Sequence, residues 1–432
     1  MGARPARPYN GNVRYGVIAD DLTGACDVAG RLTHLGYRPI IYVSPVTPKK
    51  SLAFLPDEAA VVIVNTRSRD GSLREAVARA RAAARFLERH GAPVTYQKID
   101  STLRGHWAEE MRSIAQVIQP QHVLLCPAFP AQGRLVRNGH LRVRPGPCPD
   151  ISDFSATNEE PSIGVRITKR CRWDALEVHR GVIRRGPEAI RAAVHTGAGA
   201  DCVVFDAERD ANLQATCRAL RRSAGRLLWV GSAGLVRYAI PPPSRPESAL
   251  PSRRRFPWLF VQGSRQAISA QQFRLLRQSR GICTIEFSPS RSRKNREEWC
   301  ASLVAALAVG TDVAVTAPEK FDARVPIALR CFLDSLLRAV VRGAKLGGIF
   351  ISGGQTAEAV CDSLRVAMLR VVEEVSPGIA ASLALDGRCP GLCLVTKAGG
   401  FGRSHEVCKI LEEYVRVRSR RSTQAYNRHH PG

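Results

Sequence analysis

The sequence predicts an α/β protein of two domains, each a largely parallel sheet flanked by helices. Short apolar runs alternate with longer amphipathic segments along most of the 432 residues, as expected of repeated strand–helix units. The alternation is interrupted at residues 241–257, PPPSRPESALPSRRRFP, where six prolines and the absence of a helical or strand period indicate an interdomain linker. The chain is also too long for one ordinary hydrophobic core.

The first domain is expected over residues 14–240. Its first helix is predicted at 24–35, because Ala25, Val28 and Leu32 fall on one face and Gly36 supplies a stop. The strands are predicted at residues 15–18, 61–64, 95–99, 122–126 and 202–205. Two further helices are predicted at residues 73–89 and 210–223.

The second domain is expected over residues 258–416. Its strands are predicted at residues 258–261, 282–287, 312–316, 348–352 and 392–396. We expect residues 1–13 and 417–432 to be disordered tails.

Composition is that of a globular protein, with 44% hydrophobic and 24% charged residues. The net charge of +26 raises the question of nucleic-acid binding. However, only nine of the 64 basic residues are lysine, and the arginines are spread along the chain without a zinc-finger, RNP or basic heptad pattern. A nucleic-acid partner is therefore not favoured, and coding bias or an anionic substrate explains the charge more simply.

Cysteine usage and hydropathy indicate a cytoplasmic protein. The thirteen cysteines are odd in number and irregularly spaced, unlike a secreted disulfide framework. The basic N-terminal residues are not followed by the apolar region of a signal peptide. No run of about 18 apolar residues occurs, so no membrane span is expected.

Polar residues at strand ends are the first candidates for a ligand-binding site, because ligands in open α/β sheets bind where strands end and helices begin. Asp20 and Asp21 follow the first predicted strand. Two adjacent carboxylates suit hydroxyl binding, proton abstraction or Mg²⁺ coordination. The alternative is that an aspartate only caps the following helix.

A second polar group follows the strand at 95–99. It comprises Lys98, Asp100, Ser101, Thr102 and Arg104. Arginine can bind a carboxylate with two hydrogen bonds while an aspartate accepts from a hydroxyl, so this group suits a polyhydroxy acid. A solvated loop is the alternative. The loop after Cys126, through Arg134, is expected to line the same cleft.

The second domain has three glycine-containing turns at strand ends. Glycine lets the backbone approach a phosphate, and the amides of the next helix then bind it. Any one such turn is a weak signal, but three together favour a nucleotide. No P-loop, GxGxxG, HExxH, GxSxG or CxxC pattern is present. The turns contain Ser264; Gly353, Gly354, Gln355 and Thr356; and Lys397, Gly399 and Gly400.

Taken in order, these motifs resemble those of the four-carbon acid sugar kinases. The resemblance covers about residues 14–416 and rests on the ordered set rather than on any single motif. The matching segments are 20–25 (DDLTGA), 98–105 (KIDSTLRG), 127–130 with 133–134 (PAFP, GR), 231–235 (GSAGL), 353–357 (GGQTA) and 397–402 (KAGGFG).

The resemblance implies an ATP-dependent kinase that phosphorylates the terminal hydroxyl of erythronate, threonate or a 3-oxo-tetronate. The first domain would bind the sugar acid, the second would bind ATP with Mg²⁺, and the active site would lie in the cleft between them. Asp20, Asp21 and Asp100 are the catalytic candidates, and Lys98, Ser101, Thr102 and Arg104 the substrate-binding ones. Ser264, Gly353 to Thr356, Gly399 and Gly400 would bind ATP.

Within this scheme we expect Arg104, alone or with Lys98, to hold the substrate carboxylate. Asp20 or Asp21 would orient or deprotonate the hydroxyl. No metal-ligating residue is assigned, no membrane contact is expected, and a homodimer is left open.

The sequence also departs from the family pattern. Gln355 stands where an aspartate is usual, Ser269 replaces a threonine, Ala398 replaces a serine, and residues 144–161 match the family's substrate loop poorly. A catalytically impaired, ligand-binding homologue is therefore the alternative to an active kinase. A basic nucleic-acid-binding protein is the third reading, and it leaves the strand-end motifs unexplained.

Overall fold

The structure is a computed structural model that describes residues 14–44, 60–143, 161–223, 225–243, 256–279, 281–289, 293–318 and 324–416. The expectations for 1–13, for 417–432, for most of the linker and for nearly all of the loop at 144–161 lie outside the described residues. Within that part of the chain, no helix is long and apolar enough to cross a membrane.

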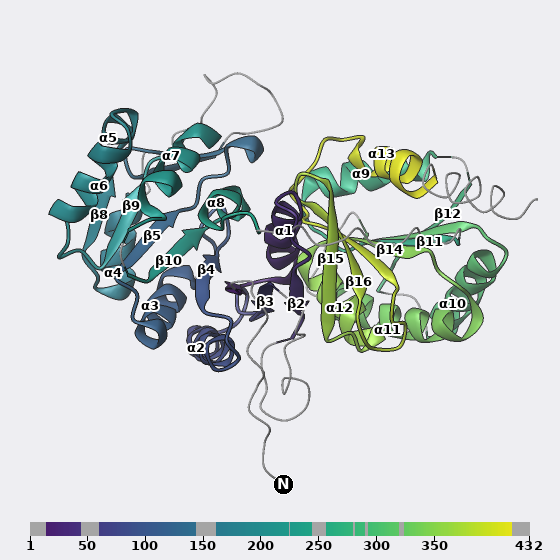
Figure 1. Ribbon diagram of the computed structural model, residues 1–432. Coiled ribbons are helices and arrows are strands. Elements are labelled where there is room, and N and C mark those ends of the chain that lie inside the picture. The colour runs from purple at the N-terminus through teal and green to yellow at the C-terminus, as the bar shows by residue number, and fades with distance from the viewer. Residues whose placement is uncertain are drawn as a thin grey trace, which may run out of the picture.

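Fifteen strands form one continuous, mostly parallel sheet (Figure 1), which confirms the predicted α/β class. From one edge to the other they are β12 (Ile282–Glu286), β13 (Asp312–Thr316), β11 (Trp258–Gln262), β14 (Gly348–Ser352), β17 (Cys393–Lys397), β16 (Ile379–Ala384), β15 (Met368–Ser376), β2 (Ile40–Tyr42), β3 (Val61–Asn65), β1 (Tyr15–Ala19), β4 (Val94–Lys98), β10 (Leu227–Gly231), β5 (His122–Cys126), β9 (Cys202–Phe205) and β8 (Ala175–Val178).

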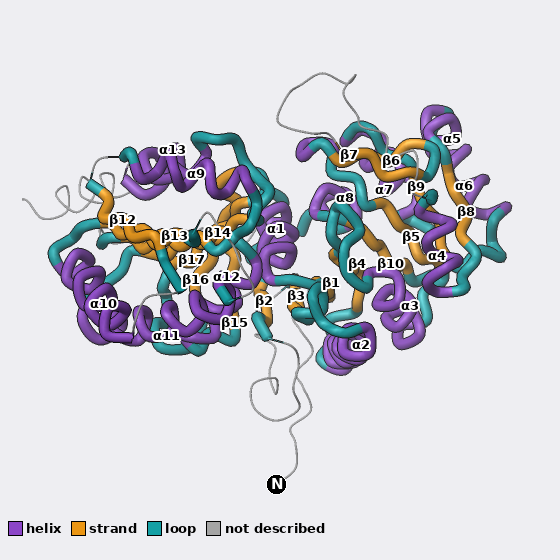
Figure 2. The backbone as a smooth tube through the Cα atoms, turned by 180° about the vertical axis from the view of Figure 1, so that it is seen from behind, coloured by secondary structure: helices purple, strands orange, loops and turns teal. Residues whose placement is uncertain are grey.

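Helices cover both faces of this sheet. In the second half α9 and α13 lie opposite α10 and α11, and in the first half α2 and α3 lie opposite α7 and α8 (Figures 1 and 2). The α-helices are α1 (Leu22–Thr33), α2 (Leu73–Arg89), α3 (Trp107–Ile118), α4 (Ile163–Cys171), α5 (Arg180–Arg184), α6 (Pro187–Thr196), α7 (Asp210–Leu220), α8 (Ala233–Ala239), α9 (Ala267–Arg277), α10 (Arg293–Ala308), α11 (Val325–Gly343), α12 (Gly354–Leu364) and α13 (Glu406–Lys409). A 3₁₀ helix, η1 (Pro130–Gln132), and a π-helix, η2 (Ile410–Arg416), complete the helical elements of the described residues.

The two halves are joined through their sheets. Strand β15 pairs antiparallel with β2, with Met368 beside Tyr42 and Arg370 beside Ile40. Helix α1 lies between the halves (Figure 1) and contacts β15 and β16 as well as its own half. Because almost every residue of α1 is buried, the helix acts as a shared core element rather than as a surface helix.

Both halves reverse their strand order beside a central strand. Strand β1 lies between β3 and β4, with Ala19 in register with Lys98. Strand β11 lies between β13 and β14, with Gln262 in register with Ser352. Ligands of open α/β sheets bind at such switch points. The polar groups that follow β1, β4, β11 and β14 are therefore brought to the positions where this fold places a ligand.

Most predicted strands are present within one residue of the expected bounds. Helix α1, however, begins at Leu22 rather than at residue 24, because the Asp21 side chain accepts a hydrogen bond from the Gly24 amide and caps the helix. Helix α7 ends at Leu220, three residues before the expected end. A hairpin, β6 (Arg134–Arg137) with β7 (His140–Val143), stands apart from the main sheet and was not predicted.

Candidate active site

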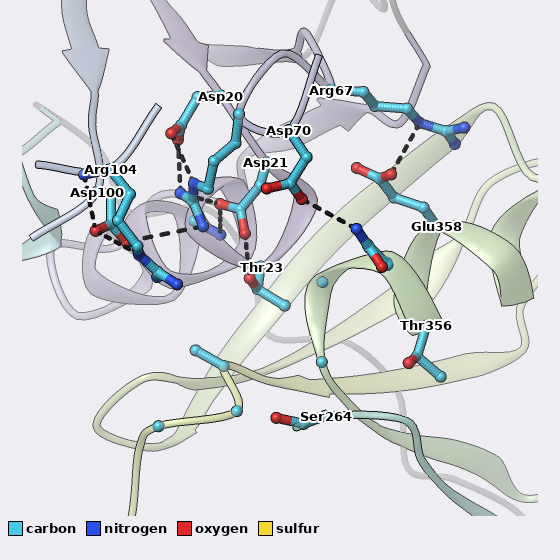
Figure 3. A pocket seen from close by; sticks show the side chains of 18 of the residues that line it. Asp20, Asp21, Thr23, Arg67, Asp70, Asp100, Arg104, Ser264, Thr356 and Glu358 are labelled. Carbon is cyan, nitrogen blue, oxygen red and sulfur yellow. Dashed lines mark hydrogen bonds and ion pairs between the residues drawn. The ribbon is translucent and has the colours of Figure 1, made fainter. Parts of the chain in front are cut away.

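A pocket of about 780 Å³ opens between the strand ends of the two halves. Asp20, Asp21, Asp100 and Arg104 lie at one end of it, and Ser264 and Thr356 at the other (Figure 3). Every site residue predicted from the sequence lines this pocket, namely Asp20, Asp21, Lys98, Asp100, Ser101, Thr102, Arg104, Ser264, Gly353, Gly354, Gln355, Thr356, Gly399 and Gly400.

Arg69 organises the acidic end of the pocket. Its Nε and Nη2 donate to the two carboxylate oxygens of Asp20 at 2.8 and 2.7 Å. Nη2 also donates to Oδ1 of Asp21 at 2.7 Å. Burial raises the pKa of Asp20, and the Arg69 guanidinium opposes that rise. One arginine thus allows two adjacent buried carboxylates to coexist.

Asp21 caps helix α1 and also lines the pocket. Its Oδ1 accepts from the Gly24 amide at 2.8 Å, and its Oδ2 accepts from the Thr23 hydroxyl at 2.6 Å. Burial would raise the pKa of Asp21, but Arg69, Lys98 and these hydrogen bonds outweigh it and lower the pKa. Asp21 therefore caps α1, as the alternative expected, but its carboxylate also lines the pocket.

Asp100 and Arg104 form a pair of their own. Nε and Nη2 of Arg104 donate to Asp100 at 2.9 and 2.7 Å, and the amide and hydroxyl of Thr102 also donate to it. Although the loop buries Asp100, these donors hold its pKa well below the usual range. The guanidinium of Arg104 therefore faces Asp100 in this structure.

The glycine turns of the second half pack closely at the opposite end. Gly353 has a φ of 114°, which lies in the region that favours glycine. A Cβ on Gly399 would collide with Oγ of Ser264, so the turns after β11 and β17 are in contact. The backbone amides of Gly354 and Gln355, in the turn after β14, lie at the start of α12, where the helix dipole favours an anion.

Contacts across the pocket connect the two halves. Gln355 donates from Nε2 to Oδ2 of Asp70 at 3.0 Å. Arg67 donates from Nη1 and Nη2 to the two oxygens of Asp362 at 3.0 and 2.8 Å, and its Nε lies 3.8 Å from Glu358. Figure 3 shows Arg67 of the first half reaching toward Glu358 of the second.

Three buried ionisable groups near the pocket have pKa values moved toward neutrality. Burial raises the pKa of Asp27 on α1 to about 7, even though Lys98 and Arg31 lower it. Burial raises the pKa of Glu358 to about 7. Burial also lowers the pKa of Lys397 to about 7. Shifts of this kind are common at functional sites but also occur in structural networks.

Two family models match the chain, a sugar-binding N-terminal domain over residues 15–239 and a nucleotide-binding C-terminal domain over residues 259–406. Among curated proteins, a D-threonate kinase of Cupriavidus necator is 30% identical, covering 89% of this chain and 94% of the relative. The chain belongs to the four-carbon acid sugar kinase family. It is a phosphotransferase that acts on a sugar acid.

Other members of the family are similarly related along nearly their whole length. A D-threonate kinase of Salmonella typhimurium is 27% identical, covering 91% of this chain and 97% of the relative. A 3-oxo-tetronate kinase of Cupriavidus necator is 27% identical, covering 90% and 94%. A solved structure from Salmonella typhimurium has the same fold, with a TM-score of 0.72 at 22% identity, covering 91% of this chain and 97% of that one.

Sequence reasoning missed several residues that line the pocket of this kinase. Arg67, Arg69 and Asp70 follow β3, at the one junction near β1 that was not singled out. The sequence does contain the same pattern there, because the polar segment 65–70 (NTRSRD) follows an apolar strand-like run. Glu358 gave no such signal, because it lies within α12 and reaches the pocket only through the packing of that helix.

Proposed function

We propose that this kinase transfers the γ-phosphoryl group of ATP to the terminal hydroxyl of a four-carbon sugar acid. The observation that carries the proposal is the closeness of the two ends of the pocket. A Cβ placed on Gly354 would lie 3.0 Å from Oδ2 of Asp21. A phosphate on the glycine turn and a hydroxyl at Asp21 would thus be neighbours, as phosphoryl transfer requires.

The acidic end of the pocket is the proposed sugar-acid site. Carboxylates accept hydrogen bonds from the hydroxyls of the substrate, while cations attract its carboxylate. The residues that would line the bound acid are Asp20, Asp21, Lys98, Asp100, Ser101, Thr102 and Arg104. Because three relatives at 27–30% identity are D-threonate kinases, threonate is the first substrate to test.

Asp21 is the proposed base. Each carboxylate oxygen can accept two hydrogen bonds, and Asp21 has three donors in Gly24, Thr23 and Arg69, which leaves room for a substrate hydroxyl. Its lowered pKa keeps it ionised at neutral pH. The hydroxyl proton would pass to Asp21 as the oxygen bonds to the γ-phosphorus and ADP leaves. Asp20 would hold Arg69, and Asp100 would hold Arg104.

The glycine turns are the proposed nucleotide site, with Ser264, Gly353, Gly354, Gln355, Thr356, Gly399 and Gly400 as its contacts. Mg²⁺ usually binds at such sites through substrate phosphates, water and one or two carboxylates. The described residues contain no cluster of three or more metal-ligating side chains, but Asp70 lies beside this turn, hydrogen-bonded to Gln355, and fits that mode. The ion would neutralise charge on the phosphates.

The experiment is an ADP-release assay with MgATP and a panel of D- and L-threonate, D- and L-erythronate and their 3-oxo forms. We expect saturable turnover with one acid, a phosphorylated terminal hydroxyl in the product by NMR, and no turnover without added nucleotide. Turnover with GTP alone would contradict the choice of ATP. Turnover with none of the acids would contradict the choice of substrate.

A further inference from the structure

The first half brings five arginines to the pocket, Arg67, Arg69, Arg79, Arg104 and Arg134. Four of them already have an acidic partner. Arg67 pairs with Asp362, Arg69 with Asp20, Arg79 with Glu75 and Arg104 with Asp100. Arg134 differs from the others, because no carboxylate of the described residues lies within ion-pair distance of its guanidinium.

The guanidinium of Arg134 is half-buried and poorly satisfied. Its Nη1 donates to the Gln132 carbonyl. Its Nε is buried and has no hydrogen-bond partner among the described residues. Burial lowers the pKa of this arginine, although guanidinium remains charged at any working pH. A buried cation without a counter-charge is costly, and an anion bound beside it would offset that cost.

The surroundings of Arg134 suit the flat carboxylate of a small acid. The Phe401 ring lies 5.5 Å from the guanidinium carbon. Phe129 meets Phe401 edge-to-face at 6.1 Å between centroids. The Phe401 ring limits how the guanidinium can turn, and Phe129 packs against that ring, so the planar guanidinium of Arg134 is held in place for a two-point contact.

We propose that Arg134 binds the carboxylate of the sugar acid, in the place first expected for Arg104. This inference rests on the proposed function and assigns the acid end of its substrate. Arg104 is held by Asp100, and its side chain is 61% exposed, so it would have to leave a partner to bind the acid. Lys98 donates to the Ile99 carbonyl and acts electrostatically on Asp21 and Asp27.

The proposal also links the acid to the nucleotide turn. Phe401 belongs to the segment that contains Gly399 and Gly400, and all three line the pocket. An acid held at Arg134 therefore lies against a side chain from the ATP-binding half. The sugar-acid site is then completed by both halves, which would make acid binding depend on the position of that turn.

The test is Arg134→Gln, assayed with the best acid from the panel and with its uncharged amide. We expect the KM for the acid to rise about 10- to 100-fold, the range for a lost charge-assisted contact. The kcat/KM for the amide and the KM for ATP are expected to stay within about 2-fold of wild type. The preference for acid over amide should therefore fall by the same 10- to 100-fold, a change that a structural role alone would not produce.

The matched control is Arg137→Gln. Arg137 lies on the same strand, pairs with Glu208 and does not line the pocket, so the acid preference should stay at the wild-type value. If Arg134→Gln does not fold, Arg134→Lys keeps the charge without the fork and should raise the KM for the acid several-fold. A folded Arg134 variant that keeps the wild-type preference for acid over amide would overturn the proposal. So would a loss of that preference in Arg104→Gln but not in the Arg134 variant.

These outcomes are separable from the proposed function. If the wild-type protein turns over no acid of the panel, the proposed function fails. In that case a calorimetric titration with threonate alone tests whether Arg134 binds a carboxylate. Binding by wild type that is lost in Arg134→Gln and kept in Arg137→Gln supports the contact, and equal binding by all three proteins overturns it.

Discussion

Gln355 Nε2 donates a hydrogen bond to Asp70 Oδ2 across the pocket, at 3.0 Å. Gln355 is the residue that departs from the usual aspartate of this turn, and its partner explains why an amide is suitable here. A carboxylate at this position would face the carboxylate of Asp70, and like charges at this separation repel. Asp70 of the opposite half therefore compensates for glutamine at position 355. The change from the usual aspartate does not by itself indicate lost catalysis.

Restoring the usual residue should weaken nucleotide binding unless Asp70 is also changed. We expect Gln355→Asp to raise the KM for ATP about 5-fold, equivalent to about 1 kcal/mol. The double variant Gln355→Asp with Asp70→Asn should regain most of that loss, because one amide again faces one carboxylate. Steady-state kinetics on the four proteins of this cycle measure the coupling, and additive effects would show that the two side chains act independently.

Asp21→Asn should lower kcat about 10²- to 10⁴-fold, the range for loss of a general base. The KM for ATP should change little, because the glycine turns remain. Asp20→Asn should lower kcat less, since Asp20 acts through Arg69. Asp334→Asn serves as a control, because it alters only an exposed pair with Arg338. Near-normal turnover in Asp21→Asn would exclude this choice of base.

Arg69→Met should destabilise the fold strongly. It leaves the buried carboxylates of Asp20 and Asp21 without their shared cation, and loss of one partner of a buried pair costs about 3–5 kcal/mol. The loss should be largest above pH 6 and smaller near pH 4, where protonation relieves the repulsion. Urea unfolding at both pH values checks this. Arg338→Met, at an exposed pair, should lose less than about 1 kcal/mol.

Glu110→Gln should stabilise the protein at alkaline pH. Burial raises the pKa of Glu110 to about 8, and the nearby Asp20 adds to the rise. The folded state therefore keeps a proton that the unfolded state releases near pH 4.5. The stability that depends on protonated Glu110 is fully present below that pH and is lost as the pH rises toward 8. The variant should match wild type near pH 4 and exceed it by about 1–3 kcal/mol at pH 8 to 9. Equal stabilities of the two proteins at pH 9 would contradict the raised pKa.

The sequence predicts helices and strands well where the pattern of apolar residues is local. The run at His122–Cys126 and the amphipathic pattern of Leu73–Arg89 have the bounds that were predicted. The strand-end rule also identified residues that meet in one pocket, because parallel strands of one sheet align their carboxyl ends. Asp20 and Asp100 could be grouped in this way without knowledge of the strand order.

Long-range pairing could not be predicted in the same way. Strand β15 has no strong apolar run over Met368–Ser376, and several of its residues are only half-buried. The contact of β15 with β2 joins residues more than 300 positions apart in the chain, and no local pattern specifies it. The pair of Arg104 with Asp100 is local, but the sequence shows only both charges and not whether they face each other or a ligand.

The junction of β2 with β15 has a consequence for the separated halves. If the chain were cut between residues 240 and 258, each fragment would expose the backbone of one strand, β2 in one and β15 in the other. Exposed strand edges recruit further strands and promote aggregation. The exposed edge strand of each fragment would pair with that of the other. The two fragments should therefore reassemble by fragment complementation when they are produced together.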